Sequence, residues 1–93
     1  MVNGIPITIK ILPPFTPNSK SIEKTFYFEE NPSIIDLLTT ASNNGILKLD
    51  SVVECNEIRD GVVVLVNGKT VFDVRHRLDK GDRVVVMPLV PGG

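Results

Sequence analysis

The residues with the clearest chemical potential in this 93-residue sequence are the last two, Gly92 and Gly93. Glycine lacks a Cβ, so another protein can approach its backbone closely and in many conformations. The one reactive group at the tip is the α-carboxylate of Gly93, a poor electrophile until an oxygen becomes a good leaving group, as in an acyl-adenylate. We therefore expect a terminus that a second macromolecule activates. The alternatives are a merely disordered end or an artefact of cloning.

The other reactive side chains offer little catalytic chemistry. Cys55 is the only cysteine and lies among acidic residues, without a neighbouring cation that would stabilise a thiolate, so we expect an incidental thiol. His76 is the only histidine and is expected to be solvated between two arginines. Asp79 and Asp82 flank a glycine, which favours turn residues over an acid/base pair.

These counts set limits on the chemistry. A single cysteine and a single histidine exclude multi-cysteine and two-histidine metal sites, so we expect no metal site. There is no glycine-rich phosphate-binding motif, and any ATP chemistry must belong to a partner. We expect no cofactor bound by this chain and no independent enzyme activity.

Composition predicts one ordinary globular domain. The chain is 42% apolar and 23% charged, and its net charge is −1. There is no basic block for nucleic acid, no apolar stretch near the roughly 18 residues that span a membrane, and no secretory signal. We therefore expect a cytoplasmic protein that binds neither nucleic acid nor membrane.

Hydrophobic spacing predicts the first elements of the fold. Residues 5–11 alternate strictly between isoleucine and other residues, which is typical of a strand with one face in the core. A Pro-rich loop follows at 13–20, and residues 25–29 predict a second strand. Asn31 and Pro32 indicate a helix start, and the apolar stripe predicts a helix over about 32–44 that stops at Gly45.

The second half of the chain adds strands. Residues 46–60 are ambiguous, although their apolar residues can cover one edge of the core. Residues 62–66 are apolar on both faces, as in a covered strand or one whose outer face awaits a partner. Asn67-Gly68 predicts a hairpin turn into a short strand at 69–71, and 84–87 predict the last strand, ended by Pro88.

This order of elements predicts an α+β fold of β-grasp (ubiquitin-like) type. We expect a mixed sheet of about five strands, with the first and last long strands as central neighbours and one helix packed across one face. The domain would span residues 1–88. Residues 89–93 would form a flexible C-terminal Gly-Gly tail.

Three motifs then resemble the ubiquitin-like sulfur-carrier family. They are VLVNG at 64–68, LDKGDRV at 78–84 and MPLVPGG at 87–93. The family includes the molybdopterin synthase small subunit, the thiamine sulfur carrier and archaeal ubiquitin-like modifiers, and the tail is most similar to the first. Leu89, Pro91 and the loop at 13–20 depart from the pattern.

The resemblance implies a reaction at Gly93. An adenylyltransferase similar to the ubiquitin-activating enzymes would use ATP and magnesium to adenylate its carboxylate, and sulfur delivery would give a thiocarboxylate. In molybdenum cofactor biosynthesis that sulfur would pass to a pterin precursor, in a complex with the molybdopterin synthase large subunit. The alternatives are a modifier joined through Gly93 to target-protein lysines, and a β-grasp interaction module without terminal chemistry.

Strand parity predicts where a partner binds. If Val84 and Val86 face the helix, then Val85 and Met87 face outward. Leu89 and Val90 would continue this apolar interface onto the tail, and Pro91 and Gly92 would thread into the partner's active site. The alternative for any single valine is ordinary core packing.

Overall fold

The first two strands form a long hairpin. A computed structural model describes residues 4–89 of the chain. The alternating isoleucines form β1 (Ile5–Ile11), and the predicted second strand lies within β2 (Ile22–Phe28), which begins before residue 25. The strands pair antiparallel along their whole length. Residues 12–21 connect them, and the ring of Phe15 in this loop is buried.

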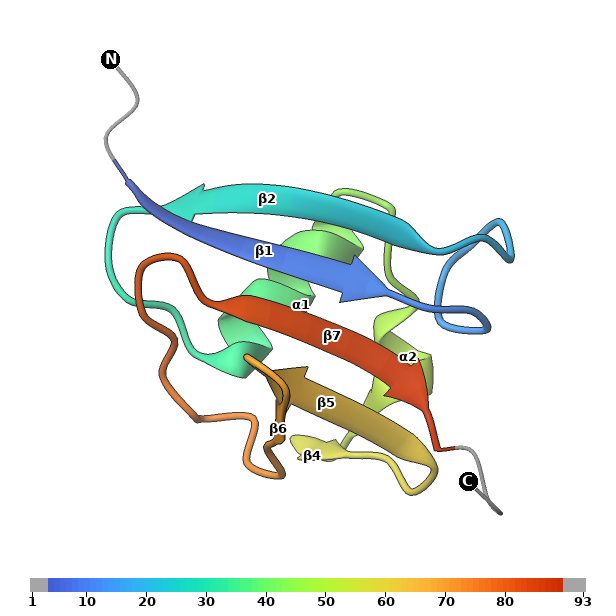
Figure 1. The fold of residues 1–93 in the computed structure, drawn as a ribbon. Helices are drawn as coiled ribbons and strands as arrows, with labels where there is room; N and C mark the ends of the chain where they lie inside the picture. Colours follow the sequence, from blue (N-terminus) through green and yellow to red (C-terminus); the bar gives the residue numbers. More distant parts are fainter. Residues whose placement is uncertain (1–3, 90–93) are drawn as a thin grey trace.

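Strands from the second half of the chain complete a mixed sheet. Within residues 4–89, β5 (Val62–Val66), β6 (Lys69–Thr70) and β7 (Arg83–Pro88) join the hairpin in the order β2-β1-β7-β5-β6 (Figure 1). β7 runs parallel to β1 and antiparallel to β5. The first and last long strands are therefore central neighbours, as the sequence predicts.

The end of β7 corrects one expectation. Pairing with β5 continues to Pro88, which lies opposite Val62, and the amide of Leu89 donates to the Gly61 carbonyl at 2.8 Å. Successive amides of a strand point to opposite sides. Because the Leu89 amide points to β5, the missing amide of Pro88 falls on the other side, where pairing with β1 has already ended at Val86. The proline therefore removes no ladder bond.

Helix α1 (Ile34–Asn43) starts later than predicted. Its N-cap is Ser33, whose hydroxyl accepts from the Asp36 amide at 3.2 Å, while the Asp36 carboxylate accepts from the Ser33 amide at 3.0 Å. This reciprocal capping box satisfies two helix-terminal donors. Asn31 instead donates its side-chain amide to Asp79 at 2.8 Å, which ties the helix entry to the loop before β7.

The ambiguous stretch forms small elements beside α1. A one-turn helix, α2 (Leu49–Val52), leads into a hairpin of β3 (Val53–Glu54) and β4 (Glu57–Ile58). The expectation of a single helix therefore misses α2. Cys55 and Asn56 form the hairpin turn with φ values of 52° and 61°, the left-handed pattern of a tight hairpin.

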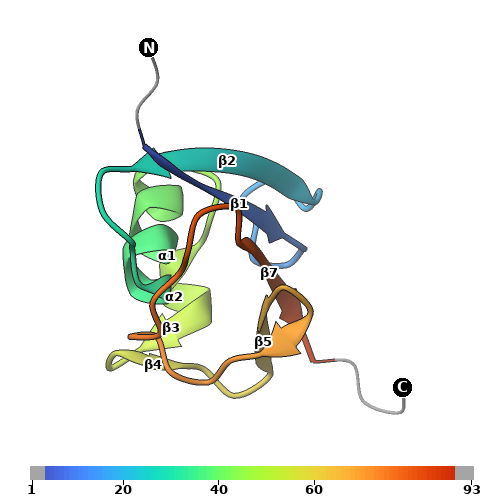
Figure 2. The same cartoon turned by 60° about the vertical axis from the view of Figure 1, so that its left-hand side comes forward.

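The core lies between the sheet and the helices. Figure 2 shows α1 and α2 on the same face of the sheet. Alternate residues of β1, β5 and β7 face α1, and the fully buried members of this core include Ile9, Leu37, Leu38, Val84 and Val86. The α+β, β-grasp architecture expected from the sequence is confirmed. No helix within residues 4–89 is long and apolar enough to cross a membrane.

Candidate functional site

Strand β7 presents two different faces. Val84 and Val86 have no exposed surface, whereas Val85 and Met87 are only partly buried. Alternate side chains of a strand point to opposite faces. Val85 and Met87 therefore lie on the sheet face that α1 does not cover, in the orientation that strand parity predicts. Their assignment to a partner interface stays a prediction.

β5 extends this surface with two residues that the sequence analysis did not single out. Val63 lies opposite Met87, and Leu65 lies opposite Val85. Directly opposed residues of antiparallel strands share a face, so the four side chains form one cluster, here called the outer patch. The signal for Val63 and Leu65 was present in the sequence, because residues 62–66 are apolar on both faces.

The chain leaves the sheet beside the outer patch. Leu89 follows β7 directly, and 62% of its surface is exposed although its amide is bonded to Gly61. The other predicted tail residues, Val90, Pro91, Gly92 and Gly93, lie outside the described residues. The expectation of a flexible tail over 89–93 is therefore not tested. The described part places Val85 and Met87 along the outer face of β7 and Leu89 directly after the strand.

The opposite end of β7 is held by a polar network, here called the turn clamp. The side-chain amide of Asn67 donates to the Asp82 carboxylate at 2.9 Å, and its side-chain oxygen accepts from the Arg83 amide at 2.9 Å. The second Asp82 oxygen accepts from the Asp79 amide at 2.8 Å. Asn67 has a φ of 51°, which asparagine tolerates better than most residues.

The turn clamp explains two of the sequence motifs. VNG supplies Asn67, and KGD supplies Asp82, so the motifs bind each other across the junction of β5 and β7. Asp79 and Asp82 act as turn residues, as expected. Charge-assisted hydrogen bonds are the stronger kind, and here they fix the strand that carries the tail.

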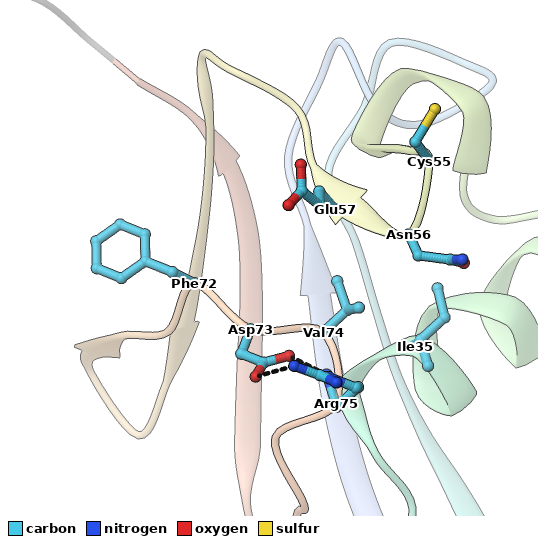
Figure 3. Close-up of a pocket in the computed structure, with 8 residues that line it drawn as sticks. All are labelled: Ile35, Cys55, Asn56, Glu57, Phe72, Asp73, Val74 and Arg75. Carbon is cyan, nitrogen blue, oxygen red and sulfur yellow. Dashed lines mark hydrogen bonds and ion pairs between the residues drawn. The ribbon is translucent and has the colours of Figure 1, made fainter.

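Away from β7, one hollow of about 620 Å³ contains Cys55. Figure 3 shows that the Cys55 thiol points away from the Asp73–Arg75 ion pair, in which Nε of Arg75 lies 3.2 Å from the carboxylate. Cys55 is exposed, as is His76. No base lies beside the thiol among the residues drawn, so this hollow lacks the pairing that activates a nucleophile.

The ion pair in this hollow shifts the pKa values of both its members, Asp73 and Arg75. Hydrogen bonds from the backbone amide and the side chain of Arg75 lower the pKa of Asp73. In return, the hydrogen bond to Asp73 raises the pKa of Arg75. Both groups are solvent-exposed, and such shifts do not by themselves indicate catalysis. Within residues 4–89, no group of three or more histidines, cysteines or carboxylates could hold a metal ion.

Comparison with known proteins places these features in a family. The model of the ThiS family matches residues 18–93, and this match includes the VNG, KGD and Gly-Gly motifs. No curated protein matches the chain.

Two solved structures share the fold. The crystal structure of SAMP1 from Haloferax volcanii has 19% sequence identity and a TM-score of 0.68, over 95% of this chain and 99% of that one. The solution structure of the HVO 2177 protein from Haloferax volcanii has 23% identity and a TM-score of 0.61, over 100% of this chain and 92% of that one. At these identities the likeness shows the fold.

Proposed function

Because the chain belongs to the ThiS family, a ubiquitin-like sulfur-carrier family, we propose that Gly93 is the reactive C-terminus of a sulfur carrier. An activating enzyme uses ATP and magnesium to join the Gly93 carboxylate to AMP, and pyrophosphate leaves. A sulfur nucleophile at the oxidation level of sulfide then displaces AMP and leaves a thiocarboxylate. The observation that carries this proposal is that the family match runs through the terminal glycines to residue 93.

The described geometry supports this role. The turn clamp fixes one end of β7, and the polypeptide leaves the sheet at the other end through Leu89. We place the partner on the outer patch, with Leu89 and Val90 continuing the contact and Pro91 and Gly92 passing into the partner's active site. Val63, Leu65, Val85 and Met87 offer this partner apolar surface that the core does not use.

The sulfur acceptor we favour is a pterin precursor in molybdenum cofactor biosynthesis. The similarity of residues 87–93 to the tail of the molybdopterin synthase small subunit supports this choice, and a large catalytic subunit would then be a second, cytoplasmic partner. The same acyl-adenylate can instead be attacked by a lysine of a target protein, which would make the chain a modifier. Both outcomes start from one activated terminus.

Intact mass spectrometry separates these outcomes. The chain is incubated with ATP, magnesium, a purified activating enzyme of the family and a sulfide source, and a parallel sample lacks ATP. A sulfur carrier gains the mass difference of one oxygen replaced by sulfur, only with ATP. A modifier appears on lysines of other proteins when a cell extract is added. If the mass stays unchanged in every condition, or if the natural chain continues beyond residue 93, the proposal is wrong.

A further inference from the structure

A hollow of about 420 Å³ lies where the tail leaves the sheet. We call it the tail-root groove, and its apolar walls come from β4, β5, the segment after β6 and the residue after β7: Ile58, Val62, Val63, Phe72 and Leu89. β6 pairs with only Leu65 and Val66, so in the described chain the start of β5 has no strand on that edge. Val63 also belongs to the outer patch, and the two surfaces are therefore continuous.

The groove displays the two most exposed large apolar side chains of residues 4–89. Phe72 is 82% exposed and Leu89 is 62% exposed. Figure 3 shows the ring of Phe72 projecting away from the neighbouring residues. Exposed aromatic rings beside a hollow are typical of the anchors of protein interfaces, because burying them on binding contributes much of the affinity.

The charges at the groove define the partner's chemistry. Arg59 is already engaged, with Nε donating to the Asp50 carbonyl at 2.8 Å and a terminal nitrogen 3.3 Å from the Glu54 carboxylate. Glu57 and Asp60 also line the groove, and neither makes an ion pair within residues 4–89. The tail-root groove therefore presents two negative charges without an ion-pair partner in the described chain beside its apolar walls.

The length of the remaining chain identifies the occupant. Gly93 is only the fourth residue after Leu89, and four extended residues span at most about 14 Å. An enzyme that holds Gly93 at its active site must therefore cover the surface from which Leu89 emerges.

We infer that the tail-root groove is a docking site for the activating enzyme, which inserts an apolar side chain beside Phe72 and places lysine or arginine against Glu57 and Asp60. This inference rests on the proposed function. The groove adds a second point of recognition, outside the tail and at the edge of the outer patch.

Steady-state ATP–pyrophosphate exchange tests the inference, with the activating enzyme that charges the wild-type chain and with carrier concentration varied. Phe72→Ala should raise the KM for the carrier about tenfold and leave kcat within about twofold, since a uniform binding contact is lost. Glu57→Lys combined with Asp60→Lys should also raise the KM for the carrier. The increase should be larger at low salt than at high salt, because salt screens the charges.

Matched controls come from the opposite edge of the sheet. Tyr27 on β2 is another exposed aromatic residue, at 59%, and Glu29 is an exposed carboxylate just beyond that strand. Tyr27→Ala and Glu29→Lys should keep the wild-type KM. Circular dichroism verifies that each variant is folded, which we expect because all five substituted positions are exposed.

The outcomes separate the two claims. If the wild-type chain is charged and Phe72→Ala keeps its KM, the groove is not a docking site although the proposed function stands. An equal rise in KM for Tyr27→Ala also overturns the inference. The inference is also overturned if sedimentation shows that the wild-type chain is a dimer and that Phe72→Ala dissociates this dimer without changing the KM. The occupant of the groove is then a second copy of the chain. If no activating enzyme charges the wild-type chain, the proposed function fails and the inference fails with it.

Discussion

The two ends of β7 are supported in different ways. At its start, the turn clamp joins Asn67, Asp82 and Arg83, and β7 pairs with both β1 and β5. At its end, pairing with β1 has stopped, and beyond Pro88 one backbone bond from Leu89 to Gly61 remains. The side-chain hydrogen bonds of the turn clamp are therefore concentrated at the start of the strand. From this contrast we predict that the start of β7 serves stability and that its end serves recognition.

The largest expected effect comes from a deletion at the C-terminal end of the chain. Deleting Gly92 and Gly93 should lower the rate of ATP-dependent charging at least about a thousandfold. The terminal carboxylate then belongs to another residue, and the tail is two residues too short to reach the partner's active site. The free energy of unfolding should change by less than about 0.5 kcal/mol, since no described contact is lost. Pyrophosphate exchange and urea denaturation measure the two quantities. A large loss of stability would show that the tail is part of the globule.

Met87 tests whether the end of β7 serves recognition. Met87→Asp places a charge in the outer patch and should raise the KM for charging about twentyfold, by roughly 2 kcal/mol of binding free energy. The fold should survive because Met87 is only partly buried. The matched control is Val86→Asp, one residue earlier on the buried face, which should prevent folding because it buries an unpaired charge. Unfolding of Met87→Asp, or unchanged charging, would contradict the assignment.

Asn67 tests whether the start of β7 serves stability and not recognition. Asn67→Ala removes both side-chain hydrogen bonds of the turn clamp and leaves a φ of 51° to a residue that tolerates it less well. We expect a loss of about 1–2 kcal/mol of unfolding free energy. Asn67→Gly relieves the backbone strain without restoring the bonds, so it should recover part of this loss. Charging of the folded variants should stay normal. A charging defect without destabilisation would place the clamp in the interface.

Much of the fold follows from local patterns in the sequence. Strict alternation predicts β1, and Asn67-Gly68 predicts the β5–β6 turn, because each signal is contained in a few neighbouring residues. The predicted start of α1 is slightly too early because two capping signals overlap. Asn31 is a residue type that often caps helices, but Ser33 is the N-cap because Asp36 completes its capping box.

The candidate site is less accessible to sequence analysis. The outward positions of Val85 and Met87 follow from strand parity, whereas most of the predicted tail lies outside the described residues. The turn clamp does not follow from the sequence, because its bonds join residues 67 and 82 only after β5 and β7 pair. The tail-root groove is harder still. Its walls come from three separate segments, which are residues 57–63, Phe72 and Leu89, and the exposure of Phe72 depends on where each of them lies.

The smallest expected effect comes from an ion pair that extends the supported start of β7. Arg83 contacts Glu23 of β2 across the outer face of the sheet, and both side chains are about half exposed. Exposed pairs contribute little because water and salt screen them. Glu23→Gln should therefore lower the free energy of unfolding by less than about 1 kcal/mol, and this difference should shrink in high salt. Denaturation at two salt concentrations measures it. A loss as large as that of Asn67→Ala would mean that the support of β7 reaches across β1 to the edge of the sheet, rather than ending at the turn clamp.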